Sequence, residues 1–560
     1  MQRYIRVALI AALLPLQGAA LPKPAYDVVI RGGTIVDGSG GAPYIGDLAI
    51  AGDSIAAVGR VEGTGAREID ARGLAVSPGF INMLSWATDA LIEDGRSQGD
   101  IRQGVTLEVF GEGWSEGPLT EQMRREEQDQ QGDIKYEITW TTLAQYLDYL
   151  TSRGISPNVA SFVGATTVRI HELGHENRAP TPAELDRMRA LVRQAMEQGA
   201  LGVGSSLIYS PANYAGTDEL VALARVAAGY GGMYISHVRD EGNHVLDAVN
   251  ELITIAREAG IRAEIYHLKA SGRANWGKLD SVIALVEDAR RNGLAITADM
   301  YTYPASATGL DATMPTWVQE GGLDAWVARL RDPATRRRLA AEMKSGTEYD
   351  NALVNAGGAE GVLLVGFKQD SLKYLTGKTL ADVARARGTS PEETAMDLVI
   401  QDNSRVSCVF FAMSEENVRK KIALPWVSFG SDAGSYSTEG VFLRSSTHPR
   451  AYGNVARLLG RYVRDEGIIP LQEAVRRLTS FPAANLRIQR RGSLRPGYYA
   501  DVVVFDPATV QDHATFTAPH QYSTGVRHVF VNGIQVLRDG EHTGATPGRV
   551  VRGPGYGVTK

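Results

Sequence analysis

Residues 233–269 read MYISHVRDEGNHVLDAVNELITIAREAGIRAEIYHLK, and this stretch decides the fold. It begins with an apolar, β-rich run that ends at His237 and closes with a second run that ends at His267. A helical pattern of apolar residues separates the two runs. Strand, helix and strand in this order are typical of a βαβ unit in a parallel sheet.

Eight runs of this kind follow one another along the chain, with helical patterns between them. They span residues 79–83, 106–111, 159–164, 202–209, 233–237, 263–267, 295–301 and 426–432. Eight parallel strands with intervening helices predict an α/β fold of the (β/α)8, or TIM-like, barrel type. The active site of such a barrel forms at the carboxyl ends of its strands.

Short β-rich runs near both chain ends predict a second domain. They lie at residues 27–30, 34–36, 47–50 and 55–58, and again at 500–505, 526–532 and 535–537. We therefore expect one β-domain built from residues 21–77 and 486–560, joined to a barrel that spans residues 78–485.

The interval between the seventh and eighth barrel runs is far longer than one helix needs. It contains a helix-like stretch at 323–344 and strand-like stretches at 361–366 and 406–413. We expect an inserted subdomain or lid over about residues 305–420, before the last barrel strand.

Composition excludes several classes of protein. The chain has 560 residues, with 58 Lys and Arg against 64 Asp and Glu, and this net charge of −6 argues against nucleic acid as a partner. The single cysteine, Cys408, excludes an intramolecular disulfide and a cysteine-cluster metal site. We expect Cys408 to be inert core, since it lies in an apolar run.

The first 20 residues have the pattern of a signal peptide. Arg3 and Arg6 precede an apolar run at 7–16, and small residues follow at 18–20. The run is far shorter than the ~20 residues that a membrane span needs. We expect export to the periplasm or the medium, with no membrane span once the signal is removed.

Polar residues at the strand ends indicate a metal site. His237, His267 and Asp432 each end a predicted barrel strand, and Glu112 follows another. Imidazole nitrogens and carboxylate oxygens that converge from different strands suit a zinc ion with three protein ligands and an open position for water. Zinc would lower the pKa of that water towards about 7, so that hydroxide is available at neutral pH.

A competing zinc motif lies at residues 171–175, where HELGH matches H-E-x-x-H. Such a motif needs a helix that places both histidines on one face. Gly174 within it and Pro180 shortly after it favour a loop, so we interpret the match as chance.

Several motifs resemble those of the N-acyl-D-amino-acid deacylases (D-aminoacylases) of the amidohydrolase superfamily. They are SSLIYSP at 205–211, SHVRDEG at 236–242, HLK at 267–269, NWG at 275–277, GSD at 430–432 and HPR at 448–450. The tail is similar as well, with GYYADVVVFD at 497–506, HQY at 520–522 and GEHTG at 540–544. The resemblance extends over about residues 26–553 and implies the barrel and β-sandwich architecture of that superfamily.

The resemblance also implies roles for individual residues. His237 and His267 correspond to two zinc ligands of the family, and Asp432 to its catalytic acid/base. Where the family has Gly-Asn-Cys-Gly with a cysteine ligand, this chain reads Gly111-Glu112-Gly113 and is one residue shorter. We expect Glu112 to replace the cysteine. Glu108 and Glu116 flank it, but we place one inside the strand and the other beyond its end.

Four more residues correspond to the substrate site of the family. Lys269 and Arg450 match residues that hold the substrate carboxylate, and a guanidinium suits this role because it binds a carboxylate through two parallel hydrogen bonds. Tyr209 and Tyr303 match residues that line the site. We expect Arg239, Asp240 and Glu241 to begin a helix and to have structural or rim positions.

One departure concerns the metal count. The first strand of the family normally ends in His-x-His, whereas this chain has Leu84 and Trp86 at those positions. A second metal ion should therefore be absent. A single metal held by one glutamate and two histidines resembles the N-acetylglucosamine phosphate deacetylases of the same superfamily.

These observations predict a hydrolase with one divalent metal ion, zinc being the expected one. Its substrate would be an N-acyl-D-amino acid or a dipeptide with a D-configured carboxyl-terminal residue. The alternatives are a hydrolase of another C–N bond, such as a cyclic amide or an N-acyl-L-amino acid, and a metal-free barrel that acts as a periplasmic binding protein. A protease that uses His171 and His175 is a further alternative.

Overall fold

The computed structural model describes residues 24–345 and 348–558. The signal peptide expected over residues 1–20 lies outside these ranges. Among the described residues, no helix is both long and apolar enough to cross a membrane.

All eight expected barrel strands are present. They are β6 (Phe80–Asn82), β7 (Val105–Phe110), β8 (Asn158–Ser161) with its continuation β9 (Val163–Gly164), β10 (Gly202–Ser206), β11 (Met233–His237), β12 (Arg262–Ile265), β13 (Ile296–Met300) and β17 (Val427–Phe429). The strand expected at 202–209 is shorter than predicted, because the chain leaves the sheet after Ser206.

The strands pair in parallel and in sequence order around a ring. One set runs β6-β7-β8 and the other β9-β10-β11-β12-β13-β17. The amide of Met83 donates to the carbonyl of Phe429 at 3.2 Å, and residues 85 and 433 form a parallel bridge, so the last strand returns to the first. This is the arrangement of a (β/α)8 barrel, and it confirms the expected fold class.

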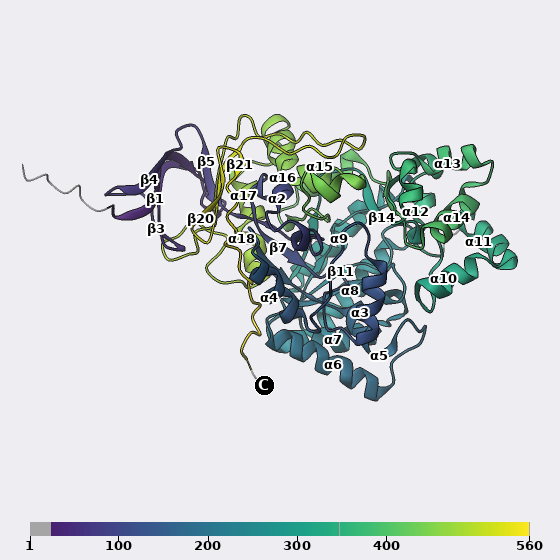
Figure 1. Cartoon of the computed structure of the whole chain (residues 1–560). Coiled ribbons are helices and arrows are strands. Elements are labelled where there is room, and N and C mark those ends of the chain that lie inside the picture. The colour runs from purple at the N-terminus through teal and green to yellow at the C-terminus, as the bar shows by residue number, and fades with distance from the viewer. Residues whose placement is uncertain (1–23, 346–347, 559–560) are drawn as a thin grey trace, which may run out of the picture.

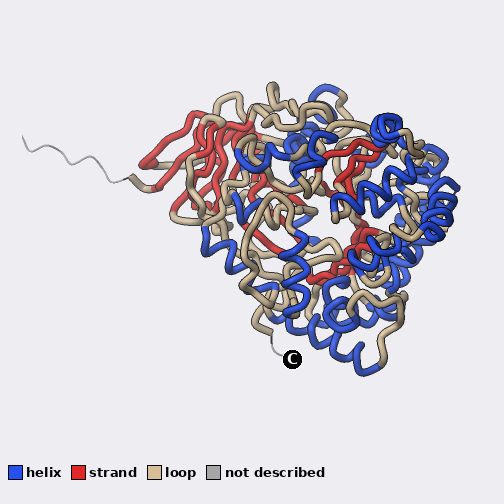
Figure 2. The backbone as a smooth tube through the Cα atoms, turned by 45° about the vertical axis from the view of Figure 1, so that its right-hand side comes forward, coloured by secondary structure: helices blue, strands red, loops and turns tan. Residues whose placement is uncertain are grey.

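Helices surround the strands (Figures 1 and 2). The helix α8, for example, buries its apolar face against the barrel. Gly260 caps its carboxyl end with a φ of 62°, which lies in the left-handed region. The helices of the barrel are α1 (Ala90–Glu93), α2 (Gln98–Ile101), α3 (Glu121–Gln130), α4 (Leu143–Arg153), α5 (Ala165–Leu173), α6 (Pro182–Glu197), α7 (Thr217–Gly229), α8 (Val245–Ala259), α9 (Lys278–Arg291), α15 (Glu415–Ile422), α16 (Arg450–Arg457), α17 (Leu471–Leu478) and α18 (Ser480–Asn485).

Both chain ends contribute to one nine-stranded sheet, which lies at the left of Figure 1. Its hydrogen-bonded order is β21-β20-β19-β18-β5-β1-β2-β3, with β4 paired to β1. The strands are β1 (Tyr26–Ile35), β2 (Tyr44–Ala51), β3 (Ser54–Gly59), β4 (Gly65–Asp70), β5 (Ala75–Pro78), β18 (Val502–Phe505), β19 (Val526–Val531), β20 (Ile534–Arg538) and β21 (Glu541–His542).

The runs at 27–30 and 34–36 were expected to be separate strands, and the structure corrects this. They form the single strand β1, whose register against β2 shifts between Ile30 and Gly33. Gly32 has a φ of 65°, a conformation open to glycine, so the chain bulges there without ending the strand.

The inserted unit follows β13 and lies at the right of Figure 1. It has an antiparallel sheet, β14-β16-β15, and its own apolar cluster, in which Cys408 is fully buried. Pro333 divides the single helix expected at 323–344 into two, because proline suits the first turn of a helix but not its interior. The elements are β14 (Ser306–Gly309), β15 (Val362–Gly366), β16 (Ser407–Phe410), α10 (Gly322–Leu330), α11 (Pro333–Ser345), α12 (Ala352–Asn355), α13 (Leu380–Arg387) and α14 (Pro391–Asp402).

Candidate metal centre and active site

The carboxyl ends of β7, β11 and β12 bring Glu112, His237 and His267 together. Glu112 Oε1 lies 3.1 Å from His237 Nδ1 and 2.8 Å from His267 Nε2. One candidate ligand atom from each residue lies within 4.8 Å of the other two, and all three residues are buried. These are the three residues that the sequence analysis assigned to the metal.

The backbone around this cluster is tightly constrained. Gly111 and Gly113, on either side of Glu112, have φ values of 106° and 72°, and a Cβ atom at either would meet backbone within 3 Å. His267 has a φ of 34°, unusual for a residue with a side chain, and its amide donates to Asp299 Oδ1 at 2.8 Å. Strain of this kind is often concentrated at functional sites.

The charges of the cluster favour a cation. Burial would raise the pKa of Glu112, but the two histidines outweigh burial and hold that pKa well below its usual range. Burial and Lys269 lower the pKa of His267, but the carboxylates of Glu112 and Glu241 outweigh them and raise it to about 10. The carboxylates thus favour a positive charge at the cluster, and a divalent ion could take the place of the protons bound to the histidines.

Asp432 lies beside the cluster. Its carboxylate Oδ2 is 2.9 Å from Arg450 Nη2, and Oδ1 accepts a hydrogen bond from Trp86 Nε1 at 3.2 Å. Burial raises the pKa of Asp432, and Arg450 partly opposes this effect. Arg450 Nε and Nη1 are buried with no hydrogen-bond partner among the described residues, so two donors of the guanidinium are available to a ligand.

Lys269 is already engaged. Its ammonium donates to Glu241 Oε1 at 2.7 Å and lies 2.7 Å from His267 Nδ1. Glu241 also approaches both histidines, at 3.2 Å from His267 Nδ1 and 3.5 Å from His237 Nε2. Carboxylates in this position orient metal-binding histidines in many proteins.

The two predicted tyrosines differ in position. Tyr209 packs edge-on against His237, with ring centroids 5.5 Å apart. Tyr303 lies farther out, where its hydroxyl donates to Asp512 at 3.2 Å and its ring packs on His448. A third tyrosine, Tyr301, contacts Arg450, whose guanidinium lies 4.4 Å from the centre of the tyrosine ring.

The H-E-x-x-H segment does not form a metal site. His171 and Glu172 belong to the last turn of α5, which corrects the expectation of a loop, but the helix ends at Gly174 before the second histidine. His171 Nδ1 contacts Glu172, whereas His175 Nε2 contacts Glu126 at 3.1 Å. The two histidines therefore have separate partners and share no ligand position.

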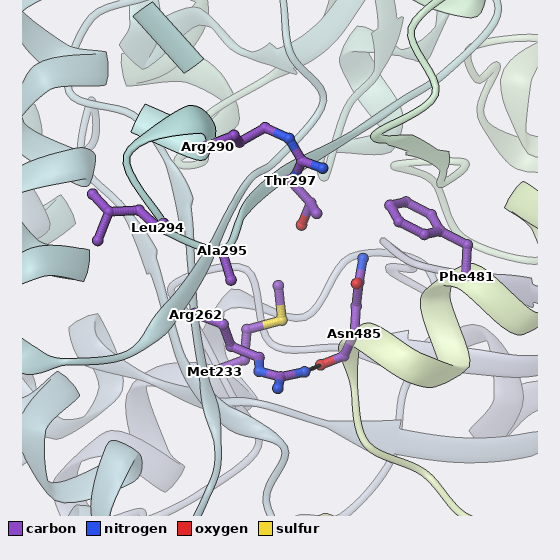
Figure 3. Close-up of a pocket in the computed structure, with 9 residues that line it drawn as sticks. Met233, Arg262, Arg290, Leu294, Ala295, Thr297, Phe481 and Asn485 are labelled. Carbon is purple, nitrogen blue, oxygen red and sulfur yellow. Dashed lines mark hydrogen bonds between the residues drawn. The ribbon is translucent and has the colours of Figure 1, made fainter. Parts of the chain in front are cut away.

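A cavity of about 340 Å³ lies at the other end of the barrel strands (Figure 3). It is lined by the first residues of β11 and β12, Met233 and Arg262, and by Phe481 and Asn485 from α18. Catalytic groups of such barrels gather at the carboxyl ends of the strands, so this cavity is not the candidate active site.

Comparison with known proteins agrees with this geometry. Residues 67–537 match the model of the amidohydrolase family. The chain belongs to this family. A D-aminoacylase of Alcaligenes xylosoxydans xylosoxydans is 32% identical, and the match covers 94% of this chain and 97% of the relative.

Solved structures give the same result for this amidohydrolase. A D-aminoacylase structure, described in terms of a binuclear metal centre with one-metal activation and second-metal attenuation, has a TM-score of 0.79 and 31% identity, over 94% of this chain and 100% of that one. An N-acyl-D-glutamate deacylase of Bordetella bronchiseptica, in complex with zinc and a phosphonate that mimics the tetrahedral intermediate, has a TM-score of 0.77 and 29% identity, over 94% and 99%.

Two residues of the amidohydrolase site escaped the sequence analysis. Glu241 was expected at the start of a helix or at the rim, but α8 begins only at Val245 and Glu241 is buried beside the histidines. Trp86 was noted only for the histidine that it replaces, yet its indole contacts both Glu112 and Asp432. The departure from the family pattern at Trp86 was the one sequence signal available.

Proposed function

We propose that this protein is a metal-dependent amide hydrolase that deacylates N-acyl-D-amino acids or cleaves dipeptides with a D-configured carboxyl-terminal residue. The observation that carries the proposal is the cluster of Glu112, His237 and His267 beside Asp432, in a chain that matches a D-aminoacylase over 94% of its length. We also propose that the barrel spans residues 78–485 and that the β-domain is formed by residues 21–77 and 486–560. All the residues of the cluster fall within these barrel limits.

Glu112, His237 and His267 would hold one divalent ion, with zinc the best match to one carboxylate and two imidazoles. The bound ion supplies a water of lowered pKa and polarises the substrate carbonyl. The fit rests on three buried donor atoms within 4.8 Å and on His237 Nε2, which is buried and has no hydrogen bond within the described part of the chain.

Asp432 would accept the proton of the attacking water and pass it to the leaving amine. Burial raises the pKa of this carboxyl and brings it closer to neutrality, where proton acceptance and donation are both effective. The left-handed backbone at Asp432, with a φ of 51°, and the donation of its amide to the Leu84 carbonyl hold the side chain in position.

Arg450 would bind the substrate carboxylate through the donors that lack a partner among the described residues, and Lys269 would add a second positive charge near the ring of Tyr301. Anchoring the carboxylate fixes the amide beside Asp432 and the ligand cluster. Tyr209 would line the site at His237, and Tyr303 would line its outer part beside His448.

A substrate panel tests the proposal. The purified protein is incubated with N-acyl-D- and N-acyl-L-amino acids matched in acyl chain and side chain, with cyclic amides and with dipeptides, and release of free amine is measured. We expect release from the D compounds, loss of activity after chelation and recovery with Zn²⁺. Release from the L series or the cyclic amides alone would contradict the proposed substrate class.

We also propose that the protein works outside the cytoplasm, on the basis of the signal-peptide pattern in residues 1–20. Fractionation of a native host, with an amino-terminal sequence of the mature protein, tests this. A mature chain that begins near residue 21 in the periplasm or the medium is the expected result, and an unprocessed cytoplasmic chain would contradict it.

A further inference from the structure

The indole of Trp86 lies between the two carboxylates of the site. Its Nε1 is 2.9 Å from Glu112 Oε2 and 3.2 Å from Asp432 Oδ1. A single N–H group is thus shared between a candidate metal ligand, which follows β7, and the candidate proton acceptor, which follows β17; these two strands flank β6 in the ring.

The backbone holds the indole in this place. The amide of Trp86 donates to the Ala433 carbonyl at 3.0 Å, and the amide of Asp432 donates to the Leu84 carbonyl at 2.8 Å. These bonds join the ends of β6 and β17, so Trp86 and Asp432 belong to one rigid corner. The indole also packs against the apolar cluster inside the barrel.

A point between two carboxylate oxygens is where a second cation would be expected to bind. Both carboxylates lie within hydrogen-bond distance of the same N–H group, so their negative charges face each other across it. The N–H of Trp86 relieves part of this repulsion without adding a charge. Leu84, two residues earlier, is fully buried and offers no ligand atom in its side chain.

We propose that the indole N–H of Trp86 replaces a second cation between Glu112 and Asp432, so that the protein binds one metal ion and Trp86 positions both carboxylates. The catalytic part of this inference rests on the proposed function, whereas the metal count does not. A D-aminoacylase relative is described as having a binuclear centre and second-metal attenuation. In this chain the bridging position is filled, and we expect excess metal not to attenuate activity.

Three variants separate the roles of the indole. Trp86→Phe removes the N–H and keeps a ring, and the double variant Leu84→His with Trp86→His restores two nitrogen ligands. Trp317→Phe is the matched control, because Trp317 Nε1 also donates to a carboxylate, that of Glu342 at 2.8 Å, but within the inserted unit. Each protein is titrated with Zn²⁺ by calorimetry, and bound zinc is counted by elemental analysis.

We expect one zinc per chain in the wild type, in Trp86→Phe and in the control, even with excess Zn²⁺, and a second, weaker ion in the double variant. We also expect kcat of Trp86→Phe to fall about tenfold with KM changed less than twofold, because the indole positions Asp432 rather than the substrate. The control should retain the kcat and KM of the wild type.

A second zinc ion in the wild type would overturn the inference, whether or not any substrate is hydrolysed. So would a Trp86→Phe enzyme with unchanged kcat. If no N-acyl-amino acid is hydrolysed, the proposed function fails, yet a single zinc in the wild type and a second in the double variant would still support the exclusion of a second ion by Trp86.

Discussion

In the proposed mechanism, proton transfer depends on Asp432. Replacing it with asparagine keeps an oxygen for the Trp86 N–H but removes the proton acceptor. We expect Asp432→Asn to lower kcat by about 10²- to 10⁴-fold, the usual contribution of a general acid or base. Metal content should stay at the wild-type value, since Asp432 lies outside the ligand cluster. An Asp432→Asn enzyme that keeps its metal and most of its activity would refute the assignment.

Arg450 carries the prediction about substrate binding. Its Nε and Nη1 donors have no partner among the described residues and are open to a carboxylate, and a lysine cannot present several donors from one rigid plane. Loss of one charged hydrogen bond costs about 1.5–3 kcal/mol, so we expect Arg450→Lys to raise KM by about 10- to 100-fold. Arg419→Lys is the control, since Arg419 pairs with Glu466. Equal KM values for Arg450→Lys and wild type would exclude Arg450 as the anchor.

The residues of the site differ in how far the sequence reveals them. His237 and His267 end successive strands of a βαβ pattern, so the strand periodicity alone predicts that they lie side by side. Glu241 and Trp86 could not be placed in this way. The side-chain direction of Glu241 is set by the irregular loop between β11 and α8, and the role of Trp86 depends on contacts between residues 26 and 346 positions apart in sequence.

At the scale of elements, three barrel strands and α18 meet around Glu264 of β12. This carboxyl is fully buried and accepts hydrogen bonds from Thr297 at 2.5 Å, Ser428 at 3.3 Å and Asn485 at 3.4 Å. Burial nevertheless raises its pKa from 4.5 to about 7. The folded state therefore holds a proton here over a pH range in which the unfolded chain has released it.

Glu264 should make stability depend on pH. Its contribution is fully present below pH 4.5 and is lost as the pH rises through about 7, and the difference corresponds to about 3 kcal/mol. Glu264→Gln resembles the protonated acid at every pH. We expect the melting temperature of the wild type to fall more than that of Glu264→Gln between pH 5 and pH 8. Identical pH profiles would contradict a raised pKa at this position.

Elements were predictable where periodicity is regular. All eight barrel strands follow from alternating strand and helix patterns, because each buried strand needs an apolar run. The short strands β4, β5 and β21 were not predicted: β4 and β5 pair with partners distant in sequence, and β21 has only two residues. The helix expected at 323–344 is divided at Pro333. The apolar pattern continues on both sides of this proline, so the pattern alone did not indicate the break.

For the whole molecule, a buried ion pair of the carboxyl-terminal segment lies where the terminal sheet meets the barrel. Arg491 contacts Asp501, and each side chain is 6% exposed. Asp501 also approaches Asn158 of the barrel strand β8 and accepts from the amide of Asn532 at 2.8 Å. The carboxyl-terminal part of the chain and the barrel thus meet at one polar junction.

Breaking this pair should destabilise the whole chain. Arg491→Ala leaves Asp501 as an uncompensated buried charge, which typically costs about 3–5 kcal/mol. We expect a lower melting temperature, measured by calorimetry, and a partial recovery in Arg491→Met with Asp501→Leu, where no lone charge remains. Arg495→Ala is the comparison variant. A melting temperature of Arg491→Ala equal to that of the wild type would show that the junction does not hold the domains together.

We propose that Glu112, His237 and His267 hold a single catalytic metal ion. Elemental analysis of the purified wild type and of Glu112→Ala, with amide hydrolysis assayed on the same samples, tests it most directly. Glu116→Gln is the control, because Glu116 is a buried carboxyl near Glu112 but outside the ligand cluster. We predict about one zinc per chain in the wild type and the control, and loss of zinc and activity together in Glu112→Ala. A Glu112→Ala protein with full zinc content and activity, or a folded wild type that binds no metal, would contradict the claim.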